Sequence, residues 1–295
     1  MLDYITYLIY KIFKFKVKIL PKSMVKSYLD LVANSLHFID RRHRRYALAN
    51  LDIMFGKSKT LEEKNAIIKQ TYKVLVYNLY EFIQNQTQDL AGYEAKITLQ
   101  NDQVLKDAIA NDRKIILVTA HFGNWEYGNT FIPLKYNKAT TMVGKPMRNK
   151  YFNGELKDTR TSNDTEMLDR KNAGKGLVKA LKQDKILGLV IDQHDSKGID
   201  VEFFGKKCKM IESTSRLAIK FDAVLIPLFF RCDGFEKYTA LFGDPIEPKD
   251  FKGENQVENL TYKQAQVMED VIRQNPENWF LQHRRWKAYF PEVYK

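Results

Sequence analysis

His121 and Glu126 are the residues of this chain whose types and spacing could do acid–base chemistry. They follow an apolar run at residues 115–118, which indicates a buried strand of a parallel sheet. In a continuous helix, residues five apart point about 140° away from each other, so the two side chains meet only if the backbone bends. The spacing therefore predicts a bend that brings both groups to the carboxyl edge of a sheet, where open α/β folds bind ligands.

The residues between the two suit such a bend. Gly123 permits a tight turn, and we expect Asn124 to cap a helix whose first turn carries Glu126. A carboxylate bonded to one ring nitrogen fixes the imidazole tautomer and leaves the other nitrogen free to take a proton from a hydroxyl. The pattern thus indicates a general base. From the spacing alone, a strand-end histidine without a chemical role is the alternative.

The composition indicates a folded protein with an anionic partner. Of 295 residues, 44% are hydrophobic and 13% aromatic, which suits one large core or two small ones. Lysine and arginine number 48 against 36 acidic residues, and the net charge of +12 favours phosphate-rich or otherwise anionic partners. Nucleic acid is not expected, because no zinc-finger spacing, RNP-like motif or clear helix-turn-helix pattern is found. Cys208 and Cys232 are too few for a disulfide scaffold, and we expect both thiols to be reduced.

Residues 1–20 predict a helix that associates with a membrane. Lysines occupy one helical face, and a second face is apolar and consists of Ile5, Leu8, Ile9, Ile12 and Phe15. Lys11, Lys14, Lys16 and Lys18 argue against a spanning helix and favour one lying in the headgroup region of an anionic leaflet. A signal-peptide cleavage site is not evident. An amphipathic helix packed on the domain and a short spanning anchor remain alternatives.

Residues 21–295 are expected to form one domain, with a helical part at 21–95 and an α/β core at 96–295. No repeat or linker divides this region. Strand-like and helical patterns alternate in the core, which is typical of an α/β sandwich with a largely parallel sheet. The predicted strands are 115–120, 140–144, 186–191, 224–230 and 238–242. The predicted helices are 124–134, 149–158, 174–183, 213–221 and 256–273.

A set of ordered blocks extends over about residues 46–287. They are Met167-Leu-Asp-Arg-Lys171 with Lys179-Ala-Leu-Lys182, Ile191-Asp-Gln193, Val201-Glu-Phe-Phe-Gly205, and 279–286 with its central His283-Arg-Arg285. The segment from His121 to Glu126 also resembles the His-x4-Asp/Glu motif of the glycerolipid acyltransferase superfamily. Together the blocks resemble the late acyltransferases of lipid A biosynthesis, the lauroyl and myristoyl transferases.

The resemblance implies a glycerol-3-phosphate-acyltransferase-like fold and an activity. A fatty acyl chain would pass from acyl carrier protein to a hydroxyl of a lipid A precursor, normally one bearing two Kdo sugars, at the cytoplasmic face of a bacterial inner membrane. By resemblance His121 is the catalytic base and Glu126 its partner, while Arg160 contacts a substrate phosphate or the developing oxyanion. No metal or redox cofactor is expected. The chain has no Gly-x-Ser-x-Gly elbow, so direct transfer without an acyl-enzyme is favoured.

Further residues are expected to contact substrate. Besides Arg160 they are Lys145, Arg148, Gly123, Asn124, Arg170 and Asp192. Lys145 and Arg148 lie close enough in sequence to the first motif to line the same cleft. Backbone amides near Gly123 or Asn124 are candidates for the oxyanion. Arg170 is a weaker candidate, since the neighbouring aspartate suits a structural ion pair.

Residues 192–195 depart from the family pattern. The family has an acidic residue in this region, and either Asp192 or Asp195 could occupy its place. Asp192, His194 and Asp195 could also ligate a metal, so a metal-dependent phosphoesterase remains an alternative. A phospholipid acyltransferase acting on glycerol phosphate or lysophosphatidate is another, although residues 201–205 lack its Phe-Pro-Glu-Gly-type motif. A basic protein that holds lipid without catalysis is the third.

Overall fold

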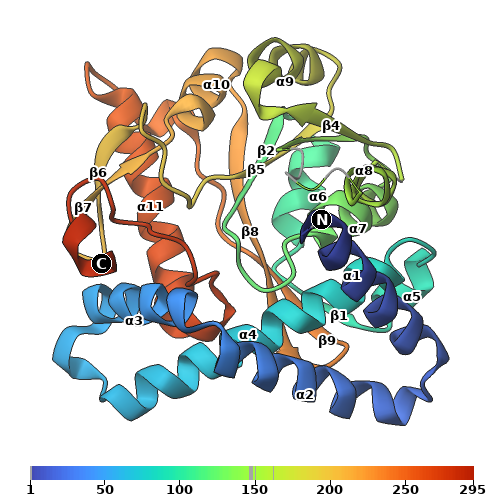
Figure 1. Cartoon of the computed structure of the whole chain (residues 1–295). Helices are drawn as coiled ribbons and strands as arrows, with labels where there is room; N and C mark the ends of the chain where they lie inside the picture. Colours follow the sequence, from blue (N-terminus) through green and yellow to red (C-terminus); the bar gives the residue numbers. More distant parts are fainter. Residues whose placement is uncertain (1, 146–148, 150, 162) are drawn as a thin grey trace.

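Among the residues that the computed structural model describes, 2–145, 149, 151–161 and 163–295, seven strands form a central sheet (Figure 1). Their order across the sheet is β1-β9-β8-β2-β5-β3-β4. The strands are β1 (Ile97–Gln100), β2 (Ile115–Thr119), β3 (Thr140–Gly144), β4 (Thr165–Asp169), β5 (Ile186–Val190), β8 (Val224–Gly234) and β9 (Lys237–Phe242). All neighbouring pairs are parallel except β8 and β9. The prediction of an α/β fold with a largely parallel sheet is confirmed.

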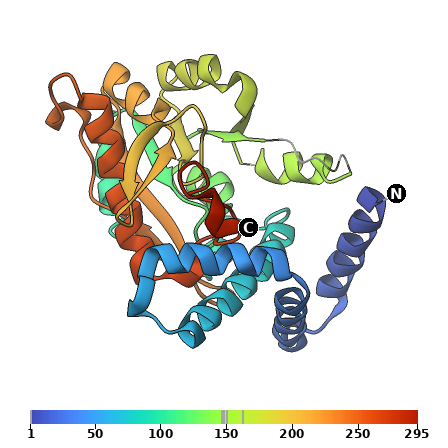
Figure 2. The same ribbon diagram turned by 60° about the vertical axis from the view of Figure 1, so that its left-hand side comes forward.

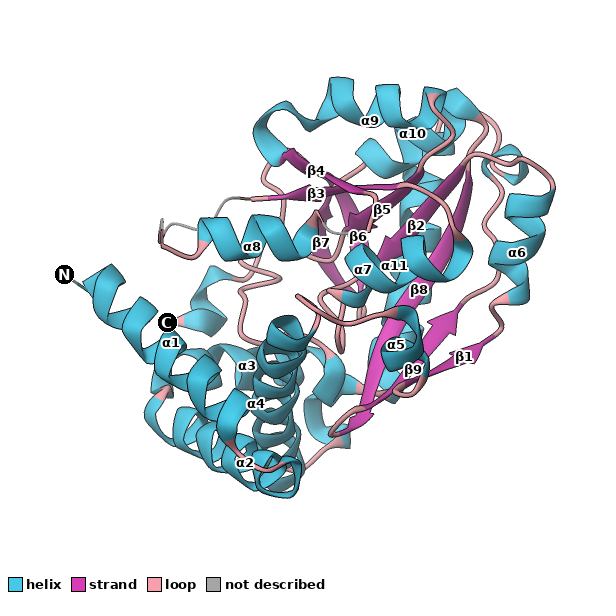
Figure 3. Ribbon diagram, turned by 90° about the vertical axis from the view of Figure 1, so that its right-hand side faces the viewer, coloured by secondary structure: helices cyan, strands magenta, loops and turns pink. Residues whose placement is uncertain are grey.

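The helices cover both faces of this sheet and one end of it (Figure 3). They are α1 (Leu2–Ile19), α2 (Lys22–Ile39), α3 (Arg41–Phe55), α4 (Leu61–Gln84), α5 (Leu90–Glu94), α6 (Gln103–Ala110), α7 (Tyr127–Tyr136), α8 (Asn153–Arg160), α9 (Ala173–Lys182), α10 (Ser213–Phe221) and α11 (Gln256–Gln274). Short 3-10 turns are η1 (Gly56–Ser58), η2 (Arg170–Asn172), η3 (Pro248–Asp250), η4 (Pro276–Asn278) and η5 (Pro291–Tyr294). Helices α2, α3 and α4 lie along the end of the sheet at the bottom of Figure 1.

The core forms two layers because successive side chains of a strand point to opposite faces. On β2, Ile115 and Leu117 pack with α7 and α6, whereas Ile116 and Val118 pack with α9, α10 and α11. A strand buried on both faces needs an apolar residue at every position, which explains the continuous apolar run in the sequence.

Each predicted strand and helix of the core is present, β3 and α10 with the predicted ends and the others with shifted ends, but four strands were missed. These are β1, β4 and the antiparallel pair of β6 (Ile199–Phe203) with β7 (Lys206–Met210). They are short and carry exposed polar side chains, as in the sequence Lys-Lys-Cys-Lys-Met of β7. Such strands give no apolar run, so their pairing partners rather than their composition define them.

Helix α1 forms as predicted and packs on the domain by one face only. Tyr10, Phe13 and Val17 are buried, and Tyr7 stacks on Tyr151 just before α8, with ring centroids 5.6 Å apart. The predicted apolar face points outward: its exposed side chains are Ile5, Leu8, Ile9, Ile12 and Phe15. Figure 2 shows α1 at the side of the molecule, away from the sheet. None of the helices formed by the described residues has the length and hydropathy needed to cross a bilayer.

The carboxyl-terminal segment is tied to both the helical part and the sheet. Asn50 of α3 donates hydrogen bonds to the carbonyl oxygens of Leu281 and His283, each at 2.8 Å. Trp279 and Trp286 are fully buried. This segment therefore lies within the core, as its dense aromatic and arginine content suggests, and it reaches the site described next.

Candidate active site

His121 and Asp192 come together because they follow two neighbouring parallel strands. β2 pairs with β5 in a register that places Thr119 opposite Val190, so the residues two positions further on also lie side by side. The Nδ1 atom of His121 lies 2.7 Å from Oδ1 of Asp192. An ionised carboxylate only accepts, so Nδ1 carries the proton and Nε2 is the basic nitrogen. The side chain of His121 is 26% exposed, whereas that of Asp192 is fully buried.

Asp192 is fixed by a second donor. The indole Nε1 of Trp279 donates to Oδ2 of Asp192 at 2.9 Å, so each carboxylate oxygen has a donor. Burial opposes ionisation of Asp192, but these donors and the nearby imidazole hold its pKa well below the usual range. Trp279 is thus a functional residue that motif spacing missed. Its only signal was its place in the 279–286 block.

The two imidazoles of the site have pKa values shifted in opposite directions. Burial disfavours the protonated form of His121, yet the Asp192 carboxylate raises its pKa above the ordinary value, with a smaller contribution from Glu126. Burial lowers the pKa of the neighbouring His283 to about 4. The Nδ1–H group of His283 donates to the carbonyl oxygen of Phe280 at 2.7 Å. His283 is therefore neutral near pH 7, and His121 is the imidazole whose pKa is raised.

The turn after His121 is held by backbone bonds from two sides. The amide of Gly123 donates to the carbonyl oxygen of Asn278 at 2.8 Å, and the amide of Asn124 donates to that of Phe230 on β8 at 2.9 Å. Gly123 has φ +50°, and a Cβ there would lie 1.7 Å from the Phe230 oxygen. Glycine is required for both reasons, so the predicted tight turn is confirmed.

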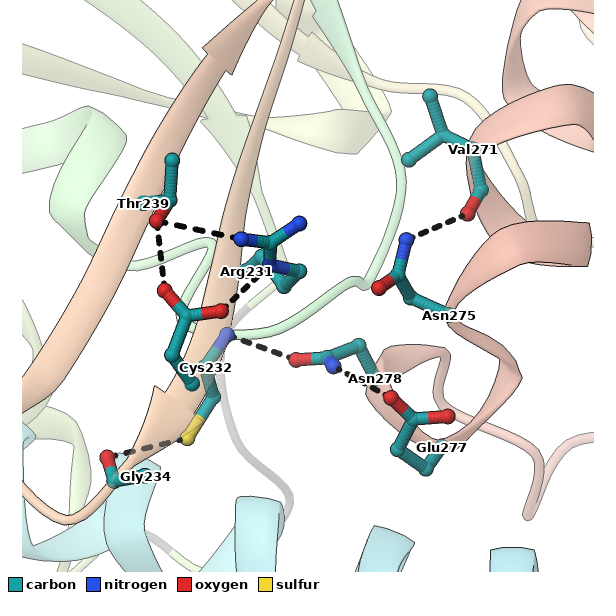
Figure 4. Close-up of polar contacts among 9 residues, drawn as sticks. Arg231, Cys232, Gly234, Thr239, Val271, Asn275, Glu277 and Asn278 are labelled. Carbon is teal, nitrogen blue, oxygen red and sulfur yellow. Dashed lines mark hydrogen bonds and ion pairs between the residues drawn. The ribbon is translucent and has the colours of Figure 1, made fainter. Parts of the chain in front are cut away.

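Asn278 connects this turn to β8, and Figure 4 shows its side chain between Cys232 and Glu277. Its Oδ1 accepts from the backbone amide of Cys232 at 2.7 Å, and its Nδ2 donates to Glu277. One residue thereby anchors both the loop that carries His121 and the last part of β8. Burial raises the pKa of the Cys232 thiol to about 12, which leaves it a poor nucleophile.

The expected contact between His121 and Glu126 is wrong. Both carboxylate oxygens of Glu126 instead accept from Arg160, at the end of α8, with Nε lying 2.8 Å from Oε2. Trp125 Nε1 and Asn129 Nδ2 donate to the same carboxylate at 3.1 Å and 2.9 Å. The chain does bend, but it turns Glu126 towards α8, while strand pairing supplies the acid for His121. Glu126 acts on the imidazole through its charge alone.

Three further expectations are corrected. Helix α7 begins at Tyr127 with Glu126 as its N-cap residue, so Asn124 is not the cap. Asn124 is fully buried and Gly123 is buried, and the amides of both already bond to carbonyl oxygens, so neither is placed to bind an oxyanion. Asp192, expected to contact substrate, is fully enclosed behind His121 and positions it instead.

Two of the remaining predicted residues, Lys145 and Arg170, line a cavity beside His121. Lys145 is exposed and lines the cavity, whereas Arg148 lies outside the described residues. Arg170 pairs with Asp195 at 3.0 Å rather than with the adjacent aspartate. Asp192 and Asp195 therefore have different partners. In the described part of the chain, no group of three or more His, Cys, Asp or Glu side chains is arranged to hold a metal ion.

A cavity of about 570 Å³ opens beside His121, within the size range of ligand pockets. The polar and charged side chains that line it include His121, Glu126, Lys145, Arg160, Arg170 and His194. Its walls are largely apolar and include Leu117, Met142, Leu177, Leu189, Ile191 and Leu228. The combination suits a ligand with a long apolar part and an anionic or polar head.

The cavity occupies a fork in the sheet. The pairing of β3 with β5 ends at Met142 opposite Gly188, whereas β2 stays paired with β5 up to Thr119 opposite Val190. Beyond Met142 the two strands diverge, and residues from both faces of β5 line the cavity. Helix α7, which follows β2, lies on one face of the sheet, and α9, which precedes β5, lies on the other. The fork therefore lies where the connections between strands change direction. Such positions are the usual ligand sites of open α/β sheets.

Comparison with known sequences identifies the family. The profile described as "Bacterial lipid A biosynthesis acyltransferase" matches residues 1–288. The chain belongs to the bacterial lipid A biosynthesis acyltransferase family. The resemblance noted from the ordered blocks is thereby confirmed, and it extends through the helical part to α1.

A more distant relative has a related name. The phosphatidylinositol mannoside acyltransferase of Mycobacterium tuberculosis (strain CDC 1551 / Oshkosh) is 24% identical over 215 residues, covering 67% of this chain and 64% of the relative. The protein of the same name from strain ATCC 25618 / H37Rv matches to the same extent. The chain thus spans less than two thirds of the length of these relatives.

Proposed function

We propose that this protein transfers a fatty acyl chain from the thioester of acyl carrier protein to a hydroxyl of a lipid A precursor of the Kdo-bearing type. The observation that carries the proposal is the His121–Asp192 pair, whose free Nε2 belongs to a residue lining a largely apolar cavity. A buried acid that fixes the tautomer of a partly exposed imidazole is the arrangement of a general base. Membership of the family supplies the reaction class.

The reaction needs no covalent acyl-enzyme. Nε2 of His121 removes the proton from the acceptor hydroxyl as its oxygen attacks the thioester carbonyl carbon. The carbon–sulfur bond of the resulting tetrahedral species then breaks, and the leaving thiolate takes the proton back from His121. Asp192 stabilises the imidazolium between the two transfers.

Arg160 is the candidate for the developing oxyanion. Its Nε and Nη2 are directed to Glu126. Its Nη1 lies 3.7 Å from the position that a Cβ on Gly144 would occupy, and both residues line the cavity. Glu126 raises the pKa of Arg160 against the effect of burial, so the guanidinium remains charged. A fixed, partly desolvated cation stabilises negative charge more strongly than one in water.

The charge of the protein suits both proposed substrates. Acyl carrier proteins are acidic, and a lipid A precursor carries phosphates and sugar carboxylates. The net charge is +12, and two of the basic side chains, Lys145 and Arg170, line the cavity. Steering of this kind raises association rates and weakens as salt is added. Salt-sensitive turnover is therefore expected.

We also propose that the protein acts at the cytoplasmic face of a bacterial inner membrane and docks there through α1. The outward face of this helix exposes Ile9, Ile12 and Phe15, each more than half accessible. An apolar face next to lysines matches a helix that lies in the interface of an anionic leaflet. The buried face of α1 keeps the docked surface in a fixed orientation to the domain.

A second acceptor class is favoured by the mycobacterial relatives, whose name gives a phosphatidylinositol mannoside as the acylated lipid. Both acceptors would be glycolipids with phosphate groups, and the charged side chains that line the cavity suit either. Mass spectrometry of the lipids formed from each acceptor, with acyl carrier protein as donor, separates the two. Transfer to lysophosphatidate alone would instead indicate a phospholipid acyltransferase.

The decisive experiment compares His121→Ala with His43→Ala, a control in α3 whose histidine is exposed, forms an ion pair with Asp40 and does not line the cavity. Transfer is measured by mass spectrometry, lipid binding by vesicle sedimentation and folding by circular dichroism. We expect His121→Ala to lose at least a hundredfold in rate with lipid binding retained. A folded His121→Ala variant with full activity would show that the protein transfers acyl chains by another route, and an inactive wild type that still binds lipid would make it a binding protein.

A further inference from the structure

The cavity has a closed end on the same face of the sheet as His121. Side chains two apart on a strand share a face, so Thr119 and Leu117 lie below His121 on β2. Leu117 is opposite Gly188 on β5, and Gly188 is opposite Met142 on β3, so these three form one row across the sheet. All three line the cavity. The next residues on this face, Ile115 and Ile186, belong to the closed core.

Met142 lies across this end because two glycines make room for it. A Cβ on Gly188 would be 2.2 Å from Sδ of Met142, and a Cβ on Gly128 of α7 would be 2.9 Å from its Cε. The thioether arm therefore runs over β5 towards α7, in space where two side chains would otherwise stand. Met142 is 9% exposed, so the arm is enclosed by the protein.

We propose that Met142 is the stop that sets the length of the acyl chain carried by the donor. This rests on the proposed function, because it takes the apolar arm below His121 as the place of the transferred chain. The acyl chain enters past His121, with its carbonyl beside the imidazole, and extends along Leu117 and Leu228. Its terminal methyl then meets the thioether of Met142. A methionine is flexible, so the limit is a preference rather than an absolute cut-off.

Two substitutions move the stop in opposite directions. Met142→Ala removes Cγ, Sδ and Cε, and we expect the preferred donor to lengthen by about two methylenes. Each buried methylene changes affinity roughly fourfold, so the ratio of rates for the longer and shorter donor rises about fifteenfold. Gly188→Ala forces the thioether into the cavity, and we expect the preference to shorten. Combining both substitutions returns the preference towards that of the wild type.

The assay uses the full-length protein and lets acyl carrier proteins that bear even-numbered saturated chains compete as donors. The products are measured by mass spectrometry. Met268→Ala is the control, because Met268 is a buried methionine of α11 that does not line the cavity. It is expected to lower stability without changing the chain-length profile. The inference is overturned if Met142→Ala and Met268→Ala give the same profile as the wild type.

A binding measurement separates this inference from the proposed function. Free fatty acids of the same lengths are titrated calorimetrically into the same variants, which needs no turnover. If no transfer occurs but the preferred fatty acid still lengthens in Met142→Ala, the reaction is wrong and the chain site stands. If transfer occurs and neither readout shifts, the chain lies elsewhere in the cavity and Met142 is not the stop.

Discussion

Asp192→Asn tests the central feature of the site, which is the tautomer of His121. An asparagine has one acceptor oxygen where the carboxylate has two. If that oxygen stays with the indole of Trp279, the amide nitrogen faces Nδ1 of His121 and forces the proton onto Nε2. If it stays with His121, the amide nitrogen faces the indole N–H, and two donors oppose each other in a fully buried place.

The size of the effect follows from these alternatives. A protonated Nε2 has no lone pair for the acceptor hydroxyl, so the contribution of the general base is lost, which is worth about 10²–10⁴ in rate. In the other arrangement, an unpaired buried donor costs about 1–3 kcal/mol of stability, and His121 loses a charge-assisted hydrogen bond. We therefore expect kcat/KM for acyl transfer to fall at least a hundredfold in a folded but less stable protein.

The pH dependence of activity should shift in a direction that a merely structural defect would not reproduce. Asp192 holds the pKa of His121 above its ordinary value, and a base must be neutral to act. Wild-type activity should thus fall as the pH drops through this raised pKa, and Asp192→Asn should move that limb to lower pH.

The ion pair between His121 and Asp192 also makes stability depend on pH. It contributes its full stability below about pH 6.5, the ordinary pKa of histidine, and this contribution is lost as the pH rises through the pKa of His121 in the folded protein. The lowered pKa of Asp192 gives the other limit: its contribution is present above about pH 3.9 and is lost as the pH falls through the folded value.

The control is Asp184→Asn, at the opposite end of β5. Asp184 is exposed and pairs with Lys114, so its loss should leave both the rate and the acidic limb unchanged. NMR titration of the His121 ring in both variants gives the pKa directly. A folded Asp192→Asn protein with a near-wild-type rate and an unmoved acidic limb would refute the assignment of His121 and Asp192 as base and orienting acid.

Three further predictions concern the surroundings of the pair. Glu126 bonds to Arg160 and not to His121, so a double-mutant cycle on acyl transfer should show coupling of more than about 1 kcal/mol between Glu126→Gln and Arg160→Ala. The effects of Glu126→Gln and Asp192→Asn should be nearly additive. The reverse pattern would indicate a functional contact between Glu126 and His121. Replacing Ile9, which is 63% exposed, by aspartate should weaken binding to anionic vesicles at least tenfold with an unchanged melting temperature, and equal sedimentation of both proteins would remove α1 from the docking surface. Gly123→Ala should cost about 4 kcal/mol or more in urea unfolding, because its Cβ would lie 1.7 Å from a carbonyl oxygen of β8, and a loss below about 1 kcal/mol would mean that the turn adapts.

The sequence predicts the elements of the sheet more readily than their partners. The strand runs at 115–120 and 186–191 are apolar apart from Thr119 and Gly188, and in each case a polar residue follows, His121 or Asp192. Whether those two residues meet depends on β5 lying between β2 and β3, which is a property of strand order and not of either run. The His-x4-Glu spacing was therefore interpreted as a contact within one loop, although the acid comes from the neighbouring strand. Parallel pairing leaves no local signal in the chain, because its partners are far apart in sequence.

The spacing of His121 and Glu126 nevertheless has a structural reason. The turn between them is fixed by backbone bonds to Asn278 and to β8, which leaves one residue at the end of β2 and the other at the start of α7. His121 is held from the strand side by Asp192, and Glu126 holds Arg160 from the helix side. Both His121 and Arg160 line the same cavity. The motif thus places His121 and, through Glu126, the guanidinium of Arg160 at one cavity, and we expect that a change of one residue in its length would rotate the helix start and misplace Arg160 while leaving His121 on its strand.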